Sequence, residues 1–393
     1  MPQLVAPYPV QVLVDPALQY FREAALGARH YGFETGRLSF VDAWLPHELR
    51  GDLRALARRD GICGVVAPLH TPSEAARFAR LGLPVVNISN AVIHPQIPVV
   101  TQDDEGAGRI AALHLIECGC RAFGFWGHPG KPYSAARLKG FRDTLKRAAP
   151  GASLSIGGGG ERGMPDWLRA LPQPAGVFTV LDSYALSLMR AARSLGRRVP
   201  DDVAVLGAGN DHFWVDFESI PLSSVRLPAW NIGYEAARLL ADLIAAKKTS
   251  HAGVRLPVVD VAARQSTAVR FVEDAAVARA VDYIRAHAHE NPYVKDVARA
   301  VGLSRTSLGA RFQQSLGRTL LTEIQLARIE LAKRLLRDSD TRLTEIAERC
   351  GFPNSQRFSV LFRQRTGQSP RAWRKFAQAV GGSALSSAGA GGL

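Results

Sequence analysis

The sequence has 393 residues, of which 47% are apolar and 21% charged, the proportions of an ordinary globular protein with two or three domains. No apolar run approaches the ~18 residues needed to span a bilayer, and the first residues lack the pattern of a secretory leader, so we expect a cytoplasmic protein. The formal charge of +14 is uneven, because the residues from Arg270 onward carry 20 Lys and Arg against 11 Asp and Glu. Such a basic surface attracts polyanions.

Residues typical of metal sites and catalysis are scattered along the chain. The four cysteines, at positions 63, 118, 120 and 350, form neither a disulfide framework nor the spacing of a zinc site. No nucleophile stands in a Ser/His/Asp order, and the ten histidines do not cluster. We therefore expect no metal, no cofactor and no catalytic residue.

The first 268 residues alternate short β-rich runs with amphipathic helical patterns. Buried strands are predicted at residues 10–14, 64–68, 84–88, 122–126, 175–180 and 203–206. Helices are predicted between them, at residues 17–31, 49–60, 106–118, 137–148, 185–195 and 232–246. This alternation predicts an α/β fold with parallel sheets and ligands at the carboxyl ends of the strands. The length favours two successive sheets over one.

The character of the chain changes near Phe271, after which no strand pattern occurs. The α/β part is expected to form two lobes, one of residues 8–99 with 228–254 and the other of residues 100–227 with 255–268. The remaining boundaries give an α/β part at 1–268, a linker at 269–274, an all-α domain at 275–379 and a Gly/Ala/Ser-rich, disordered tail at 380–393.

The helical part contains an internal repeat of two units, which is too few for a solenoid. Two pairs of positions recur at an offset of 49 residues and two at an offset of 50: Ala298 with Ala347, Gly302 with Gly351, Phe312 with Phe362 and Gly317 with Gly367. The one-residue slip predicts a longer turn in one unit. Between the units, an apolar stripe predicts a linking helix of ~18 residues, ~27 Å long.

Each unit has the features of a helix-turn-helix: a small residue at a close helix crossing, a turn glycine that tolerates positive φ, and apolar anchors on the second helix. The first unit supplies these features with Ala298, Gly302, Leu308 and Phe312. Ser304 is the predicted N-cap of its second helix. The length of the linking helix roughly suits units that reach successive major-groove segments, which lie ~34 Å apart.

The anchors leave an outward face on the second helix of each unit, where side chains can reach a DNA groove. In the first unit Gly309 and Ala310 offer few polar groups, so we expect the second unit to carry much of the base-specific readout. The predicted DNA-binding residues, base readers and phosphate contacts together, are Ser304, Arg305, Thr306, Arg311, Gln313, Asn354, Ser355, Gln356, Arg357 and Arg363.

The second unit and the residues after it carry a long ordered motif: Thr344-Glu-Ile-Ala-Glu-Arg-Cys-Gly-Phe, then Phe358 and Phe362-Arg, then Gly367-Gln-Ser-Pro-Arg-Ala-Trp-Arg. This motif resembles the signature of the AraC/XylS family of transcription regulators, and the resemblance spans roughly residues 275–377. The resemblance implies sequence-specific binding to double-stranded DNA and control of transcription, with RNA polymerase as a further partner.

The α/β part resembles the LacI/GalR type of effector-binding domain, which is itself similar to periplasmic sugar-binding proteins. Four stretches carry the resemblance: Val99-Val-Thr-Gln-Asp-Asp-Glu-Gly-Ala-Gly-Arg, Ala136-Arg-Leu-Lys-Gly-Phe, Val203-Ala-Val-Leu-Gly-Ala-Gly-Asn and Leu222-Ser-Ser-Val. A LacI-like sensor ahead of an AraC-type domain is the arrangement of the xylose operon regulator family. The resemblance implies a periplasmic-binding-protein-like fold and a homodimer controlled by xylose or a related pentose or polyol.

Four residues are first candidates for binding an effector between the lobes. The family resemblance places Arg137 where an arginine contacts sugar hydroxyls, and Asp182 ends a strand, so its carboxylate should point into the cleft. An interlobe salt bridge is the alternative role for both residues. Asp15 and Tyr20 follow the first strand on the other lobe, where a role at the helix start is equally compatible with the sequence.

The effector itself stays open at this point, because Gly209 stands where the resemblance implies an acidic residue that grips the ligand. Asn210 is the candidate that takes over this role, with Asp211 as a neighbour of the same kind. Trp214 could supply an apolar wall for a sugar ring, although a place in the core is the more common role of a tryptophan.

Two other classes of protein are compatible with parts of the sequence: a nucleotide-dependent enzyme and a sugar-binding protein without a regulatory role. Gly158, Gly160 and Gly163 fit the pattern Gly-x-Gly-x-x-Gly, but no acidic residue follows at the end of the next strand. A second glycine run, after the strand at 203–206, lacks its third glycine. The basic helical part argues against a plain sugar-binding protein.

Overall fold

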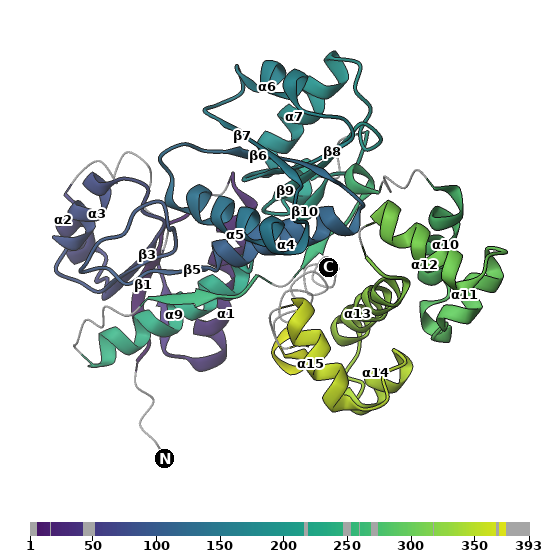
Figure 1. Ribbon diagram of the computed structural model, residues 1–393. Coiled ribbons are helices and arrows are strands. Elements are labelled where there is room, and N and C mark those ends of the chain that lie inside the picture. The colour runs from purple at the N-terminus through teal and green to yellow at the C-terminus, as the bar shows by residue number, and fades with distance from the viewer. Residues whose placement is uncertain are drawn as a thin grey trace, which may run out of the picture.

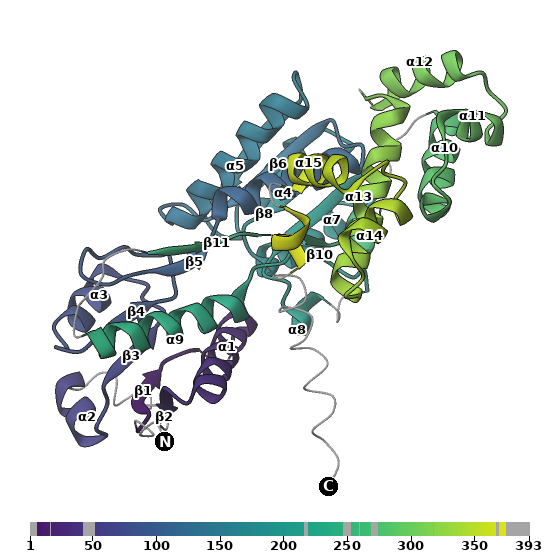
Figure 2. The same cartoon turned by 90° about the horizontal axis from the view of Figure 1, so that it is seen from below.

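The computed structural model describes residues 6–15, 17–41, 52–215, 219–246, 253–258, 260–268, 274–316, 318–366 and 369–374, with the side chains of residues 213 and 214 left out. These residues form two α/β lobes and a helical domain that lies beside the second lobe (Figures 1 and 2). The predicted tail at 380–393 and most of the predicted linker lie outside the described residues. The domain boundaries therefore stay a prediction.

The first lobe is a parallel four-stranded sheet in the order β2-β1-β3-β4, with helices on both faces. Adjacent residues of one strand face opposite helix layers: Val65 packs in one apolar cluster and Val66 in the other. The strands are β1 (Tyr8–Val12), β2 (Leu38–Phe40), β3 (Gly64–Ala67) and β4 (Val85–Asn87). The helices are α1 (Gln19–Thr35), α2 (Leu53–Arg59), α3 (Pro72–Ala79) and α9 (Ala229–Ala246).

The second lobe is a six-stranded sheet in the order β12-β10-β9-β8-β6-β7, parallel except for β12. Phe125 and Phe178 pack under α4 and α5, whereas Trp126 and Val177 pack under α6 and α7. The strands are β6 (Ala122–Gly127), β7 (Ser153–Gly158), β8 (Ala175–Thr179), β9 (Val203–Ala208), β10 (Ser223–Val225) and β12 (Val261–Ala262). The helices are α4 (Asp104–Glu117), α5 (Pro132–Ala148), α6 (Met164–Ala170), α7 (Asp182–Ser194), α8 (His212–Val215) and η2 (Gln265–Thr267).

A small parallel pair, β5 (Val100–Gln102) with β11 (Val254–Leu256), lies where the chain passes between the lobes (Figure 1). The chain therefore crosses from lobe to lobe in neighbouring segments, which permits the lobes to move about a hinge. Beside this hinge, polar groups of the two lobes bond to one another directly, as Gln19 does to residues 210 and 212.

The helical domain contains two similar pairs of helices joined by one long helix. Its helices are α10 (Ala275–Ala286), η3 (Ala288–Glu290), α11 (Val294–Ala300), α12 (Arg305–Leu316), α13 (Leu320–Asp338), α14 (Leu343–Arg349) and α15 (Ser355–Thr366). α13 contributes Ile324 to the apolar core of the first pair and Ile329 to that of the second. Each pair thus has a core of its own, and α13 fixes their separation.

The predicted fold class, an α/β part followed by an all-α domain, is confirmed. The six predicted strands correspond to β1, β3, β4, β6, β8 and β9, with β1 ending at Val12, two residues earlier than predicted. Among the described residues, no helix is both long and apolar enough to cross a bilayer. Over the same residues, no three His, Cys, Asp or Glu side chains gather as a metal ion requires, and the four cysteines are free thiols.

Candidate effector and DNA-binding sites

The second lobe forms a buried ion pair on the side that faces the first lobe, because two of its helices cross at unusually close range. A Cβ on Gly108 would lie 2.0 Å from the carbonyl oxygen of Arg137, so only glycine permits this approach of α4 to α5. The crossing brings Asp104 Oδ1 to 2.8 Å from Arg137 Nε, with both side chains buried. Arg137 also donates to the carbonyl of Val180, which follows β8. Arg137 is therefore held inside one lobe, and among the described residues its ion pair is with Asp104 of the same lobe.

Polar side chains of the first lobe and of the hinge strand β5 bond to this pair. Tyr20 Oη donates to Gln102 Oε1 at 2.9 Å, and Gln102 Nε2 donates to Asp104 Oδ1 at 3.0 Å. Asn90, after β4, donates to the other oxygen of Asp104. Burial, with the Asp104 charge nearby, raises the pKa of Tyr20, so its hydroxyl stays protonated and available as a donor. Asp104 thus receives donors from both lobes.

Asp182 lies at the same edge of the sheet but is fully engaged by its own lobe. Its carboxylate accepts a hydrogen bond from Ser224 Oγ at 2.5 Å and another from Asp211 N at 2.9 Å. A Cβ on Gly209 would lie 3.1 Å from Asp182 Oδ2, so the carboxylate occupies the space beside the missing side chain. Burial raises the pKa of Asp182 to about 6. Its direct contact with an effector stays a prediction, and no interlobe salt bridge to it is recorded among the described residues.

Asn210 adopts a left-handed backbone conformation, with φ of 56°, and its backbone N donates to Ser224 Oγ at 2.9 Å. Asp15, in contrast, is exposed and accepts a hydrogen bond from Ala17 N at 2.9 Å in a turn before α1, whose N-cap is Leu18. The side chain of Trp214 lies outside the described residues. The structure thus connects Tyr20 with Arg137 through Gln102 and Asp104, and Asp182 with Asn210 through Ser224, whereas Asp15 has only its local bond.

Gln19 joins the two lobes directly and was not predicted from the sequence. Its Oε1 accepts a hydrogen bond from His212 N at 2.6 Å, and its Nε2 donates to the Asn210 carbonyl at 3.4 Å. These bonds span more than 190 residues of sequence and carry no local motif. Gln102 and Asp104 lie inside the stretch 99–109 that was noted for its family resemblance, which was the signal that could have found them.

The two helix-turn-helix units have the geometry that the repeat predicts. The first helices, α11 and α14, are 49 residues apart, whereas the second helices, α12 and α15, are 50 apart, so the second unit has the longer turn. The turn glycines Gly302 and Gly351 have φ of 73° and 71°. Ala298 and Ala347, at the crossings, are buried. Gly317 and Gly367, the remaining recurring positions, lie outside the described residues.

Apolar anchors hold each second helix so that its opposite face points to solvent. Leu308 and Phe312 are fully buried in the first unit, and Phe358 and Phe362 are fully buried in the second. Trp373 packs edge-on against Phe362 and closes the second core. On the opposite faces, Thr306, Ala310 and Gln313 are exposed, as are Gln356, Val360 and Arg363.

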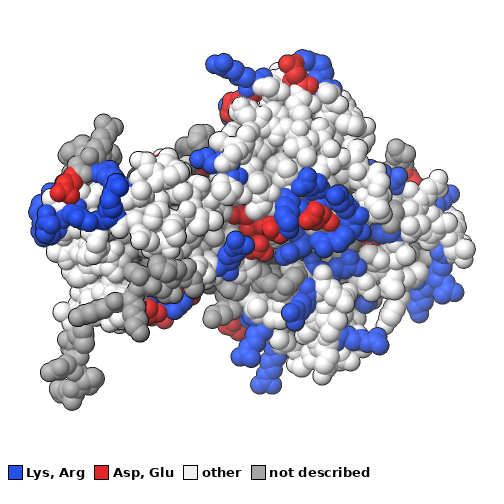
Figure 3. All heavy atoms as spheres, turned by 60° about the vertical axis from the view of Figure 1, so that its left-hand side comes forward, with Lys and Arg blue, Asp and Glu red and all other residues white. Residues whose placement is uncertain are grey.

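The predicted DNA-binding residues fall into distinct local roles. Ser304 and Asn354 cap their helices, since Ser304 Oγ accepts from Ser307 N at 3.1 Å and Asn354 Oδ1 from Arg357 N at 2.8 Å. Arg311 donates to Asp274 Oδ2 at 3.1 Å, which ties α12 to the start of α10. The side chains of Arg305 and Arg357 are exposed beside the outward faces, and Ser355 is half-buried. Lys and Arg side chains also show on the surface of the helical domain with few acidic ones beside them (Figure 3).

Two family models match the chain in these two regions. A periplasmic binding protein-like domain matches residues 112–267, and a helix-turn-helix domain matches residues 297–375. The xylose operon regulatory protein of Escherichia coli K12 is 29% identical over 326 residues, covering 79% of this chain and 83% of that protein. The HTH-type transcriptional regulator CelR of Thermobifida fusca is 31% identical over 238 residues, covering 57% of this chain and 68% of CelR.

Solved structures agree with this division. The xylose-binding transcription activator xylR has a TM-score of 0.59 and 25% identity to this chain, covering 95% of this chain and 99% of that one. The CelR–cellobiose complex has a TM-score of 0.54 and 26% identity, covering 67% of this chain and 86% of that one.

A two-lobed sensor joined to two helix-turn-helix units defines a ligand-controlled, DNA-binding transcription regulator. The chain belongs to the HTH-type transcriptional regulators, with an AraC-type helix-turn-helix domain behind a LacI-like sensor, and it is similar over most of its length to the xylose operon regulatory proteins. The predicted family and function class are thereby confirmed.

Proposed function

We propose that this regulator is controlled by a neutral sugar, a pentose or a closely related polyol, bound in the cleft between the lobes. The observation that carries this proposal is the polar chain of Tyr20, Gln102, Asp104 and Arg137, which joins the two lobes. Hydroxyl groups of a sugar both donate and accept, so they can bond to the Tyr20 hydroxyl and the Arg137 guanidinium in one closed site. The relatives named for xylose support the same class of ligand.

The charges in the cleft favour an uncharged ligand. The guanidinium of Arg137 is already neutralised by Asp104 at 2.8 Å, so an acidic sugar would bring an unmatched negative charge into a buried site. Burial of both partners makes this pair rigid and leaves hydrogen bonding as the means of recognition. Xylose is the first candidate, with Asn210 next to Gly209 as the residue that takes over from the family's acidic position.

We propose further that the regulator acts as a homodimer on two DNA half-sites in the cytoplasm, with RNA polymerase as a partner when it activates transcription. Closure of the cleft would change the relative position of the two pairs of helix-turn-helix units. The ten predicted DNA-binding residues, with the exposed Gln356 and Arg363 as base readers, are part of this proposal. We assign no catalytic activity, because the relatives are transcription regulators.

A thermal-shift screen of the full chain against pentoses, hexoses, polyols and uronic acids tests the effector class. A sugar at a hundredfold excess over its Kd should stabilise the sensor by about 2.7 kcal/mol, whereas the uronic acids should leave its Tm unchanged. Stabilisation by a uronic acid but by no neutral sugar would refute the neutral-ligand proposal.

A pair of tyrosine variants assigns the site. Tyr20→Phe should weaken binding of the sugar found in the screen about tenfold, because the ligand-facing hydroxyl is lost. Tyr234→Phe is the matched control: its hydroxyl bonds Glu34 on the exposed side of the first lobe, and affinity should stay unchanged. Equal affinities for wild type and Tyr20→Phe would place the sugar elsewhere.

A further inference from the structure

An arginine of the sensor caps the C-terminal end of α12, the second helix of the first helix-turn-helix unit. Arg121, between α4 and β6, donates from Nη2 to the carbonyl of Gln314 at 2.6 Å and to that of Ser315. These carbonyls belong to the last turn of α12, where they lack partners within the helix. A cation at this end is also favoured by the helix dipole. One domain thus completes a helix of the other.

An arginine of the helical domain likewise caps a helix of the sensor. Arg318, between α12 and α13, donates from Nη1 to the carbonyl of Ile116 at 3.1 Å and from Nη2 to that of Glu117 at 3.3 Å. These are the last carbonyls of α4, only a few residues before Arg121. Arg121 of the sensor therefore caps α12 of the helical domain, and Arg318 of the helical domain caps α4 of the sensor.

Arg318 is fixed in place by the core of its own domain. Its Nε lies 2.8 Å from Glu323 Oε2, and its guanidinium and the Glu323 carboxylate are both largely buried. Glu323 also lies 3.7 Å from Arg285 on α10. The position of Arg318 is thus set by α10 and α13 together. Its bonds to α4 therefore fix the orientation of the first helix-turn-helix unit relative to the sensor.

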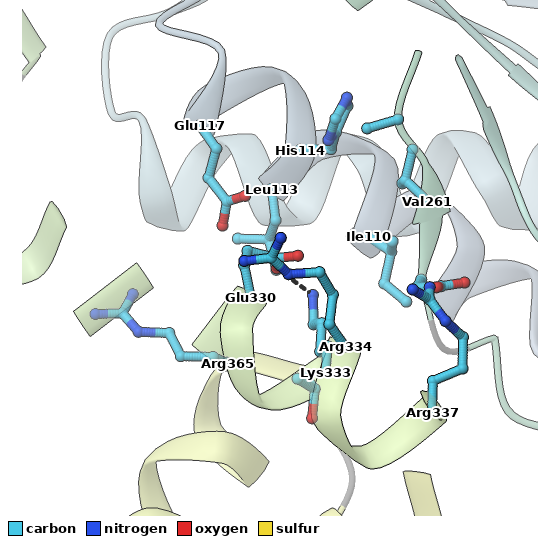
Figure 4. Close-up of a pocket in the computed structure, with 13 residues that line it drawn as sticks. Ile110, Leu113, His114, Glu117, Val261, Glu330, Lys333, Arg334, Arg337 and Arg365 are labelled. Atoms are coloured by element: carbon cyan, nitrogen blue, oxygen red, sulfur yellow. Dashed lines mark hydrogen bonds and ion pairs between the residues drawn. The ribbon is translucent and has the colours of Figure 1, made fainter. Parts of the chain in front are cut away.

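A second contact between the two domains joins α4 to α13 (Figure 4). His114 and Glu117 on α4 face Glu330 and Lys333 on α13 across a cavity of about 120 Å³. Lys333 Nζ bonds Glu330 Oε1 at 2.6 Å, and burial with the Glu330 charge nearby raises the pKa of Glu117 to about 7. The sensor residues that line this cavity all come from α4 or from residues 260–263 around β12, which belong to the second lobe.

We infer that the reciprocal caps of Arg121 and Arg318 form a clamp that holds the first helix-turn-helix unit on the second lobe as one body. The consequence rests on the proposed function: when an effector closes the cleft, α12 moves with the second lobe and changes its position relative to the first lobe. The contact between α4 and α12 itself then stays the same in both states.

Hydrogen exchange measured by mass spectrometry on the full chain, without sugar or DNA, tests the clamp. Arg121→Ala, a substitution in the sensor, should make amides at residues 313–316 of α12 exchange about two- to fivefold faster, because their helix end loses its cap. Arg318→Lys, a substitution in the helical domain, should do the same at residues 115–118 of α4. Lysine keeps the charge beside Glu323 but cannot reach two carbonyls in the manner of a guanidinium.

Arg142→Ala is the matched control, since Arg142 is another exposed arginine of the second lobe, on α5, and should leave both segments unchanged. Faster exchange that stays confined to the substituted domain would overturn the clamp, and so would unchanged exchange in both variants. Arg121 is exposed, so its removal leaves no buried group without a partner and the variant should fold. Because neither sugar nor DNA is present, a failed sugar screen leaves the result of this experiment intact.

Discussion

Replacement of Asp182 by asparagine should change how the stability of the sensor depends on pH. The Asp182 carboxylate accepts two hydrogen bonds, but it is only 5% exposed. Burial outweighs these bonds and raises its pKa from 3.8 to about 6. The folded protein therefore keeps this proton at pH values where the unfolded chain has already released it.

The sign of the effect follows from this order of ionisation. As the pH rises from 3.8 to about 6, the unfolded state ionises first, so stability falls through this window and is level above it. The difference between these pKa values, at about 1.4 kcal/mol for each pKa unit, is worth about 3 kcal/mol. Asparagine does not ionise, so the Asp182→Asn variant should lack this loss, and its stability should gain on that of the wild type as the pH rises.

Thermal unfolding of the full chain at pH 4.5, 6, 7 and 8 measures this gain. About 2 kcal/mol of the loss falls above pH 4.5, and a domain of this size shifts its Tm by about 2–4 °C per kcal/mol. The Tm of the variant minus that of the wild type should therefore grow by about 4–8 °C from pH 4.5 to pH 8. Ser183→Ala, at the exposed neighbouring position, should give a constant difference. A constant difference for Asp182→Asn as well would refute the reasoning.

Three further predictions concern other parts of the molecule. Gln19→Ala removes the side chain that bonds across the lobes, so the ligand-free protein should have a larger radius of gyration in small-angle scattering; an unchanged radius would contradict this role. Arg363→Ala should weaken operator binding by about 1–3 kcal/mol at one base pair in gel-shift titrations, whereas uniform weakening of all sequences would mark a phosphate contact. Gly302→Ala should cost about 1–2 kcal/mol through its positive φ alone. Gly351→Ala should cost more, as seen by a lower Tm, because its Cβ would lie 2.3 Å from Asn291 Oδ1; equal Tm values would refute this.

The helix-turn-helix units could be predicted from the sequence because each depends on contacts within one short segment. Gly302 and Gly351 mark the turns through their backbone conformation, and buried Phe312 and Phe362 mark the face turned to the core. Once the anchors are known, helical periodicity determines the exposed face. The 49- and 50-residue offsets even locate the extra turn residue in the second unit.

The strands missed from the sequence are those that depend on distant partners. β2, β5, β10, β11 and β12 have only two or three residues each, too few for a periodic pattern, and exist through their pairing with other strands. β7 is longer, but it lies at the edge of its sheet and is largely exposed, with serine and glycine in place of a continuous apolar run.

The sequence found only part of the polar network between the lobes, for a similar reason. Arg137 and Asp182 were found because they follow strands or match a family position, and each now has its bonds within the second lobe. The bonds that join the lobes connect residues far apart in the chain, such as Tyr20 with Gln102 and Gln19 with His212. Only the folded arrangement of the two lobes reveals such pairs.

The two helix-turn-helix units differ in what positions them, and this difference bears on how they divide the reading of DNA. The last turn of α12 is bonded to Arg121 of the sensor, whereas α15 is positioned chiefly by its own core and by α13, whose 19 residues span about 28 Å. The first unit also offers Gly309 and Ala310 where the second offers Ser359 and Val360, next to Gln356 and Arg363. The first unit is bonded to the sensor and has few polar side chains that could contact bases. Such a unit is suited to positioning the domain on DNA through contacts with the phosphate backbone. We therefore expect the second unit, which α13 holds at a fixed distance from the first, to read the bases.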